Sequence, residues 1–303
     1  MLTVTRMDLD GAGSPMALVT KILKAEPDLP IPVPIEDLAR QLDITEIRVL
    51  AADGFEGGLI TDAGRSEGFI LVNGAAGRER QRFTVGHELG HFLMTHHAPK
   101  TDAGFTCSRG DMRRARLAEM TPAVRMEVEA NEFSALLLMP PPMWRHAMNG
   151  LGDPDLGQVT ALARQFGVSK EAAARSYAQY HDAPVAIVVA KDGRLQRVYR
   201  NLSSFPKLCV AAGDPIPPSS AFHRLPATLG QMSDMVEARA QYWLESDWGT
   251  PLPELSEQVA FQRDGFAMVL LWAELAEENE DGEDNRTSKE RLRDRQAKWG
   301  DRR

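Results

Sequence analysis

The chain carries RFTVGHELGHF at residues 82–92, and this stretch decides the fold of the segment around it. The apolar spacing over Arg78–His97 predicts a helix that runs through the stretch. His87 and His91 are four residues apart, so a helix places them one turn apart on the same side. Two imidazoles in this arrangement can bind one tetrahedral zinc ion. The stretch therefore predicts a metal-binding helix.

Glu88 stands directly beside the first of these histidines. A carboxylate in that position can take a proton from an attacking water and later deliver it to a leaving amine. The alternative is a solvated helix face that carries this short motif by chance. The motif lies in the middle of a helix within a mixed α/β segment, and this context favours the metal site. We therefore predict Glu88 as the catalytic residue.

A third metal ligand is needed, because a catalytic zinc ion typically has three protein ligands and a water. The helix predicted over residues 122–139 supplies the candidates. Glu127 and Asn131 share one face, so Glu127 can bind the metal while Asn131 orients a ligating histidine. Glu129 points roughly the opposite way and is the alternative ligand; a solvated acidic face is the remaining interpretation. These donors also accept manganese or iron, but we expect Zn²⁺.

The segments around the motif mix short helices with short strands. Acidic residues in a first turn and apolar spacing indicate two helices near the N-terminus. Glycine and aspartate then separate three strand-like runs, whereas the segment between the two ligand helices is polar and has no periodicity. We expect helices over residues 15–25 and 34–42, strands over 47–50, 58–61 and 68–72, and a loop over 98–121.

Residues 154–180 predict a helix–turn–helix, in which Gly167 ends the first helix and Ser169 caps the second. Such motifs bind DNA in many proteins. Direct DNA binding is the less favoured interpretation here, because the second helix offers only two cations, Lys170 and Arg175, for phosphates and bases. We expect this segment to pack beside the metal-binding domain or to dock a protein partner.

The segment after the helix–turn–helix becomes strand-like. Hairpins are predicted over residues 185–199 and 258–272, which indicates a separate sheet-rich domain. Its tryptophans either stack on a small ligand or, as is more common, fill a core. Beyond Ala276 the chain has an acidic block and then a basic block, which predicts a disordered or singly helical tail. The tryptophans concerned are Trp243, Trp248 and Trp272.

Composition excludes several other classes of protein. The 303 residues are 43% hydrophobic and 26% charged, which is ordinary for a globular protein of about two domains. The net charge of −8 disfavours general binding to nucleic acid. Only two cysteines are present, Cys107 and Cys209, which excludes a disulfide framework and suits a reducing cytoplasm. We expect neither a signal peptide nor a membrane span.

The motif segments RQRFTVGHELGHFLMTH (residues 80–96) and EVEANEFSALLLMP (residues 127–140) resemble the ImmA/IrrE metallopeptidases of bacteria and phages. The helix over residues 34–42 and the strand around Leu59 also fit this family. The resemblance implies a gluzincin-like site. Carried over by position, the zinc ligands are His87, His91 and Glu127, and the general base is Glu88.

The resemblance also implies an α+β architecture in three parts, and the charge pattern adds a tail. The parts are a zincin-like metallopeptidase domain with the HExxH helix and a small sheet, a helix–turn–helix segment, and a sheet-rich, sensor-like (GAF-like) domain that takes a signal ligand. The loop over residues 98–121 is longer than in compact members, which puts the shape of the substrate cleft in doubt, and the tail has no family counterpart. The predicted boundaries are residues 1–148, 149–182, 183–276 and 277–303.

The family resemblance implies a cytoplasmic zinc endopeptidase. Its substrate would be a helix–turn–helix repressor of the XRE type, whose cleavage relieves repression in a stress or DNA-damage response or in a mobile element. The alternative is a regulator that binds DNA, or that sequesters a repressor, and whose zinc site is not catalytic. An intact HExxH motif with Glu127 favours the enzyme, since a binding module has no need for Glu88.

Several further side chains are candidates for supporting roles. The thiol of Cys107 can cap a zinc ion and silence it, although a free thiol is the simpler interpretation. Other side chains can donate hydrogen bonds to a tetrahedral intermediate, and the sequence does not rank them. These oxyanion candidates are His96, His97, His146, Tyr177, Tyr180 and His181.

Overall fold

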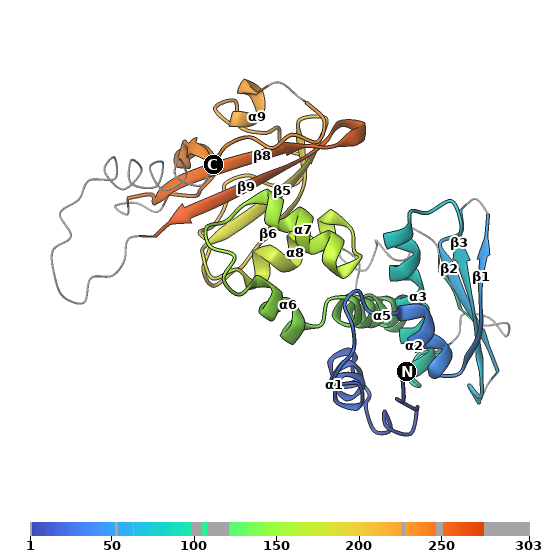
Figure 1. Cartoon of the computed structure of the whole chain (residues 1–303). Coiled ribbons are helices and arrows are strands. Elements are labelled where there is room, and N and C mark those ends of the chain that lie inside the picture. Colours follow the sequence, from blue (N-terminus) through green and yellow to red (C-terminus); the bar gives the residue numbers. More distant parts are fainter. Residues whose placement is uncertain are drawn as a thin grey trace, which may run out of the picture.

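The computed structural model confirms the α+β class and contains two separate sheets (Figure 1). It describes residues 2–51, 54–62, 64–98, 121–225, 228–246 and 251–275, and the backbone of residues 105–107. The helices lie largely between the two sheets, so the molecule is layered (Figure 1). Within the described ranges, no helix has the length and apolar character needed to cross a membrane.

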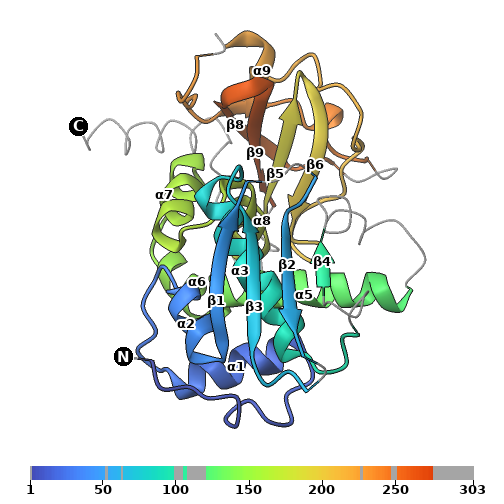
Figure 2. The same cartoon turned by 90° about the vertical axis from the view of Figure 1, so that its right-hand side faces the viewer.

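The N-terminal sheet has four strands in the order β1-β3-β2-β4, seen face-on in Figure 2. β1 runs parallel to β3, whereas β2 is antiparallel to both β3 and β4. One face is covered by helices (Figure 2), and Leu59 and Ile70 are buried in the same hydrophobic core as residues of α3 and α5. The predicted strands are confirmed, each extended by one to three residues: β1 (Ile44–Leu50), β2 (Gly57–Thr61) and β3 (Gly68–Asn73), with β4 (Phe105–Cys107) at the edge.

The covering layer consists of helices whose positions agree with the predicted ones. α3 packs on β2 and β3 with one side and on α5 with the other, so it lies at the centre of the domain. Small residues allow this double packing: a Cβ on Gly86 would lie 2.6 Å from Ser134 Oγ of α5. The helices are α1 (Pro15–Ala25), α2 (Ile35–Gln41), α3 (Arg78–Leu93) and α5 (Pro122–Leu138).

α3 ends four residues before the predicted end at His97, and this corrects the sequence-based boundary. Met94 has an extended backbone (φ −83°, ψ 92°). The guanidinium of Arg65, from the β2–β3 connection, donates hydrogen bonds to the carbonyl groups of His91, Phe92, Met94 and His97. These bonds satisfy carbonyls that a helix end leaves open, so the chain can turn after Leu93. The turn takes His97 off the helix.

The helix–turn–helix is present as α7 (Leu156–Phe166) and α8 (Lys170–Tyr180). Gly167 adopts the left-handed conformation (φ 63°) that ends α7, and Ser169 Oγ accepts a hydrogen bond from Ala172 N, as predicted. One helix was not predicted: α6 (Pro141–Met148) begins at the proline run that was expected only to stop α5. Prolines are tolerated in a first turn, where no partner for the missing N–H is needed.

The second sheet is antiparallel throughout, in the order β6-β5-β9-β8-β7. Both predicted hairpins are confirmed, and the short helix α9 (Ala221–Arg224) and the edge strand β7 (Val236–Ala238) are additions. α8 packs against β5 and β6 on one face of the sheet. The hairpin strands are β5 (Val185–Lys191), β6 (Arg194–Arg200), β8 (Glu254–Phe261) and β9 (Phe266–Glu274).

The two faces of this sheet belong to different hydrophobic cores. Alternate residues such as Ile187 and Leu270 join the large core that also contains the helical layer. Their neighbours, such as Val188 and Leu271, join a smaller core with Trp243. Trp243 is therefore a core residue, Trp272 packs against the large core, and Trp248 lies outside the described residues. The predicted domain boundaries stay predictions, and the predicted tail lies outside the described residues.

Candidate metal centre

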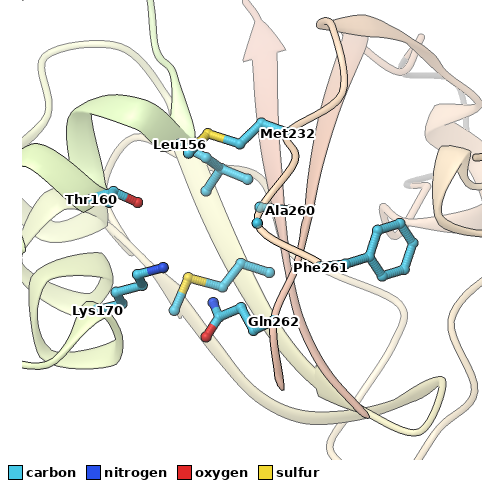
Figure 3. Close-up of a pocket in the computed structure, with 9 residues that line it drawn as sticks. Leu156, Thr160, Lys170, Met232, Ala260, Phe261 and Gln262 are labelled. Carbon is cyan, nitrogen blue, oxygen red and sulfur yellow. The ribbon is translucent and has the colours of Figure 1, made fainter. Parts of the chain in front are cut away.

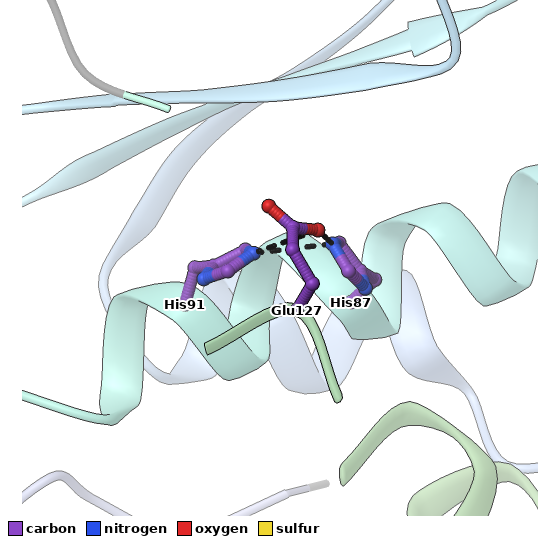
Figure 4. A group of neighbouring side chains, drawn as sticks. All are labelled: His87, His91 and Glu127. Carbon is purple, nitrogen blue, oxygen red and sulfur yellow. Dashed lines mark hydrogen bonds and ion pairs between the residues drawn. The ribbon is translucent and has the colours of Figure 1, made fainter. Parts of the chain in front are cut away.

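The structure brings His87 and His91 of α3 together with Glu127 of α5 (Figure 4). The carboxylate of Glu127 reaches between the two imidazoles. The Nε2 atoms of the histidines lie 3.1 Å apart. Glu127 Oε2 lies 3.3 Å from His87 Nε2 and 3.9 Å from His91 Nε2. The three predicted metal ligands thus converge on one point from two helices.

The spacing of these three atoms fits a small metal ion. Ligand atoms that lie 2.0–2.1 Å from a tetrahedral zinc ion are separated from one another by about 3.4 Å. The observed separations of 3.1, 3.3 and 3.9 Å bracket that value. Two imidazoles and a carboxylate are also a common protein donor set for catalytic zinc. His87, His91 and Glu127 can therefore hold such an ion with little movement of either helix.

The protonation of this group suits metal binding. Burial lowers the pKa of His91 to about 3, so this imidazole is neutral near pH 7. Burial opposes ionisation of Glu127, but the adjacent imidazoles of His87 and His91 outweigh it and hold the pKa of this carboxyl below its ordinary value. Neutral imidazoles beside a carboxylate are the forms that bind a divalent cation, because a bound proton would block the lone pair.

Glu88 is fully buried on α3, beside the Gly57 backbone of β2. A Cβ added to Gly57 would lie 2.9 Å from Glu88 Oε1 and would overlap the methyl group of Thr84. Glycine at position 57 therefore lets the strand approach the helix closely enough to enclose the Glu88 carboxylate. The predicted catalytic residue therefore lies in the interface between α3 and β2.

Asn131 lies one turn beyond Glu127 on α5, as the spacing predicts. Its Oδ1 lies 3.1 Å from His87 Nδ1. A neutral His87 that presents Nε2 to a metal carries its proton on Nδ1 and donates it to this amide oxygen. The same helix thus supplies Glu127 beside the histidines and an amide that orients one of them.

Glu129, the alternative ligand, lies away from this group and contacts two other histidines. Its Oε2 lies 2.7 Å from His96 Nε2 and 3.0 Å from His97 Nε2. His97 is buried, and its Nδ1 lies 2.8 Å from Nδ1 of His91. His97 was predicted only as an oxyanion candidate, so its contact with His91 was not predicted. The sequence carries no local signal for this contact, because the predicted helix runs through His97 whereas α3 ends at Leu93.

The other oxyanion candidates either contact residues outside the metal-binding group or are exposed. The hydroxyl of Tyr177 donates to Gln158 Oε1 and accepts from Asp155 N, which ties α8 to α7. His181 Nδ1 accepts from Ala183 N. Tyr180 lies under the guanidinium of Arg145, and His146 is exposed on α6. The proposed zinc contact of Cys107 lies outside the described side chains, since only the backbone of β4 is described.

A small pocket lies away from the metal centre, between α7, α8 and the ends of β8 and β9 (Figure 3). Lys170, one of the two cations considered for DNA binding, lines this pocket, whereas Arg175 is exposed on α8. Glu171 of α8 is hydrogen-bonded to Arg197 and to Tyr199 of β6. The second helix of the helix–turn–helix is thus held against the C-terminal sheet on this side.

Sequence comparison supports the resemblance drawn from the motif. Residues 47–177 match the sequence profile of the IrrE N-terminal-like domain. They include the three metal-binding residues His87, His91 and Glu127, together with Glu88 and Asn131. This segment is an IrrE N-terminal-like domain. The radiation response metalloprotease IrrE of Deinococcus radiodurans is 30% identical over 128 residues, which make up 42% of this chain and 36% of that protein. The family resemblance is therefore confirmed over the domain that holds the metal centre.

A solved structure of a Mycobacterium tuberculosis transcriptional regulator aligns with 88% of this chain and 74% of that chain. Its sequence is 11% identical, and the TM-score is 0.45. The IrrE-like assignment of residues 47–177 therefore depends on the domain match and on the metal centre, and not on this structural likeness.

Proposed function

We propose that this protein is a zinc-dependent endopeptidase. The observation that carries the proposal is the convergence of His87, His91 and Glu127, together with the burial of Glu88, the residue next to His87 in the chain. Three ligands leave a tetrahedral ion with one open position, which is the arrangement of a catalytic rather than a structural site. The IrrE-like domain assignment supports the same conclusion.

Each residue has a distinct role in this proposal. His87, His91 and Glu127 would hold the ion, which when bound polarises the scissile carbonyl and lowers the pKa of a water. Glu88 accepts a proton from the attacking water and transfers it to the leaving amine. Asn131 fixes the imidazole of His87. Gly57 of β2 keeps the space beside Glu88 open, because a larger side chain there would contact Glu88 Oε1.

The proposed substrate is a helix–turn–helix repressor of the XRE type, cleaved in the cytoplasm to relieve repression in a stress, DNA-damage or mobile-element response. This part rests on the family resemblance and on the relative's name, which links that protein to the radiation response. The sheet-rich segment after residue 183 is proposed to be a GAF-like sensor domain that responds to a signal ligand.

The test is zinc content and cleavage measured together in the wild-type protein and in Glu88→Gln. Each protein is incubated with the repressor that is encoded nearest to the gene of this protein. The fragments are identified by mass spectrometry. We expect about one zinc per chain in both proteins and discrete fragments from the wild type alone. The amide keeps the shape of Glu88 but cannot accept the proton.

Equal rates of cleavage by the two proteins would refute the role of Glu88. Zinc in both proteins without cleavage by either would reject endopeptidase action on that repressor and would favour sequestration by binding. In that case Glu88→Gln would also leave derepression intact in cells. Derepression that is lost with Glu88→Gln would point back to catalysis.

A further inference from the structure

His97 is a buried histidine that the proposed reaction does not use. It lies in the turn after α3, and only about 1% of its surface is exposed. One ring nitrogen, Nδ1, lies 2.8 Å from Nδ1 of His91, and the other, Nε2, lies 3.0 Å from Glu129 Oε2. The three side chains therefore form a continuous row from a carboxylate to a metal-binding imidazole.

The positions of the protons along this row follow from the geometry. His91 presents Nε2 to His87 and Glu127, so a neutral His91 that binds a metal carries its proton on Nδ1. That proton is donated to His97 Nδ1, which must then be the acceptor. A neutral His97 carries its own proton on Nε2 and donates it to the carboxylate of Glu129. The opposite tautomer of His97 would set two N–H groups against each other across 2.8 Å.

The backbone around the row is held in place independently. Arg65 donates hydrogen bonds to the carbonyl groups of both His91 and His97, and to two carbonyls between them. One side chain from the β2–β3 connection thus fixes the separation of the two imidazoles.

We propose that His97 and Glu129 are positioning residues, which hold His91 in the tautomer and orientation that bind the metal. The proposal rests on the metal centre of the proposed function. It also explains why two acids two residues apart on α5 have different partners: Glu127 faces the metal-binding group, and Glu129 anchors the row. His87 is oriented by the neutral amide of Asn131, so the two imidazoles have unlike supports.

His96 provides a matched control for His97. It is the neighbouring histidine, and it contacts the same oxygen of Glu129 at 2.7 Å, but it is partly exposed and lies at the outer end of the row. Replacing His96 leaves the contact between His97 and His91 in place. Replacing His97 with an apolar side chain removes the ring nitrogen that contacts Nδ1 of His91.

The experiment measures zinc affinity of the full chain by competition with a chromophoric chelator, without substrate. Loss of a group that orients a metal-binding histidine typically weakens metal binding 10–100-fold. We expect a loss of about that size for His97→Leu and a change within about twofold for His96→Leu. His97→Gln should recover most of the affinity, because its amide oxygen can accept from His91 and its amide N–H can donate to Glu129.

Wild-type zinc affinity in a folded His97→Leu variant would overturn the proposal. Equal losses in His97→Leu and His97→Gln would also overturn it, because they would indicate lost packing rather than a lost hydrogen bond. If His97→Leu does not fold, nitrogen-15 NMR of the zinc-loaded wild type decides instead. A proton on Nε2 of His97, with Nδ1 unprotonated, supports the row, and a proton on Nδ1 of His97 refutes it.

The zinc stoichiometry distinguishes this proposal from a second metal site. His96, His97 and Glu129 also have metal-binding side chains, but a metal on His97 Nε2 would displace the proton donated to Glu129. We expect one zinc per chain, and two would refute the proposed proton positions. These measurements need no cleavage, so the positioning role and the peptidase proposal can fail separately.

Discussion

At the scale of single residues, the sequence left open whether Glu127 or Glu129 is the third metal ligand, and the structure separates the two. Glu127 lies between the metal-binding histidines, whereas Glu129 contacts His96 and His97. We expect Glu127→Gln to weaken zinc binding at least about 100-fold, since a charged ligand is replaced by a neutral amide. Glu129→Gln keeps an acceptor for His97 and should cost about tenfold or less. Chelator competition measures both, and a reversed order would assign the ligand to Glu129.

Glu257 gives a prediction about pH at the same scale. It is fully buried in β8, where its carboxylate accepts hydrogen bonds from Ala221 N and Ser220 Oγ. Burial raises its pKa above the ordinary value despite these bonds. The raised pKa means that its contribution to stability is fully present below the ordinary glutamate pKa of about 4.3 and is lost as pH rises through the folded value.

Glu257→Gln should therefore gain stability relative to the wild type as pH rises from about 4 toward neutrality. Thermal unfolding followed by tryptophan fluorescence over this range would show the difference. Glu237→Gln, an exposed position on the neighbouring β7, is the control and should follow the wild type at every pH. Parallel curves for Glu257→Gln and the wild type would contradict the raised pKa.

The metal-binding residues were predictable because local spacing determines them. His87 and His91 share a side through helix geometry alone, and Glu127 and Asn131 do so on a second helix. The pairing of Glu129 with His97 was not predictable in the same way. It depends on where α3 ends, and that end is stabilised by Arg65, a residue 26 positions before His91. No local pattern reports a contact at that separation.

At the scale of elements, the metal centre depends on how closely α3 approaches α5. A Cβ on Gly86 would lie 2.6 Å from Ser134 Oγ and 3.2 Å from its Cβ. Gly86→Ala should destabilise the fold by about 1–3 kcal/mol through overpacking, reduced by up to about 1 kcal/mol of gained helix propensity. Moving the helices apart also separates Glu127 from His87, so zinc affinity should fall.

A double-mutant cycle with Ser134→Ala tests this cause. The cost of Gly86→Ala should be smaller by about 1 kcal/mol when the Ser134 hydroxyl is absent, because neighbouring sites are not additive. Chemical denaturation of the four proteins gives the coupling. Additive costs would mean that the Ser134 hydroxyl is not the group that resists the added methyl group.

At the scale of the whole molecule, the C-terminal sheet contributes to the core beneath the helix–turn–helix. Gln258 of β8 is buried and accepts a hydrogen bond from Leu156 N in the first turn of α7. Its amide donates to Asp155 Oδ2 and to Ser233 O. The hairpins themselves were predictable from their alternation and turns. The helix against which they pack was not predictable, since a buried strand pattern does not indicate which element covers it.

Gln258→Ala should therefore destabilise more than a local change in a strand would. It removes three hydrogen bonds and leaves buried groups unsatisfied, at about 1–3 kcal/mol. The melting temperature should therefore fall by several degrees, because each kcal/mol of destabilisation lowers it by about 2–4 °C in a domain of 150–250 residues. Gln262→Ala, just past the end of β8, is the control and should cost about 0.5 kcal/mol or less.

Differential scanning calorimetry of the zinc-loaded proteins measures the cost of both substitutions. Zinc affinity should be unchanged in each variant, because Gln258 contacts α7 rather than α3. Equal melting temperatures for the two variants would show that the contact of Gln258 with α7 does not couple the sheet to the helices.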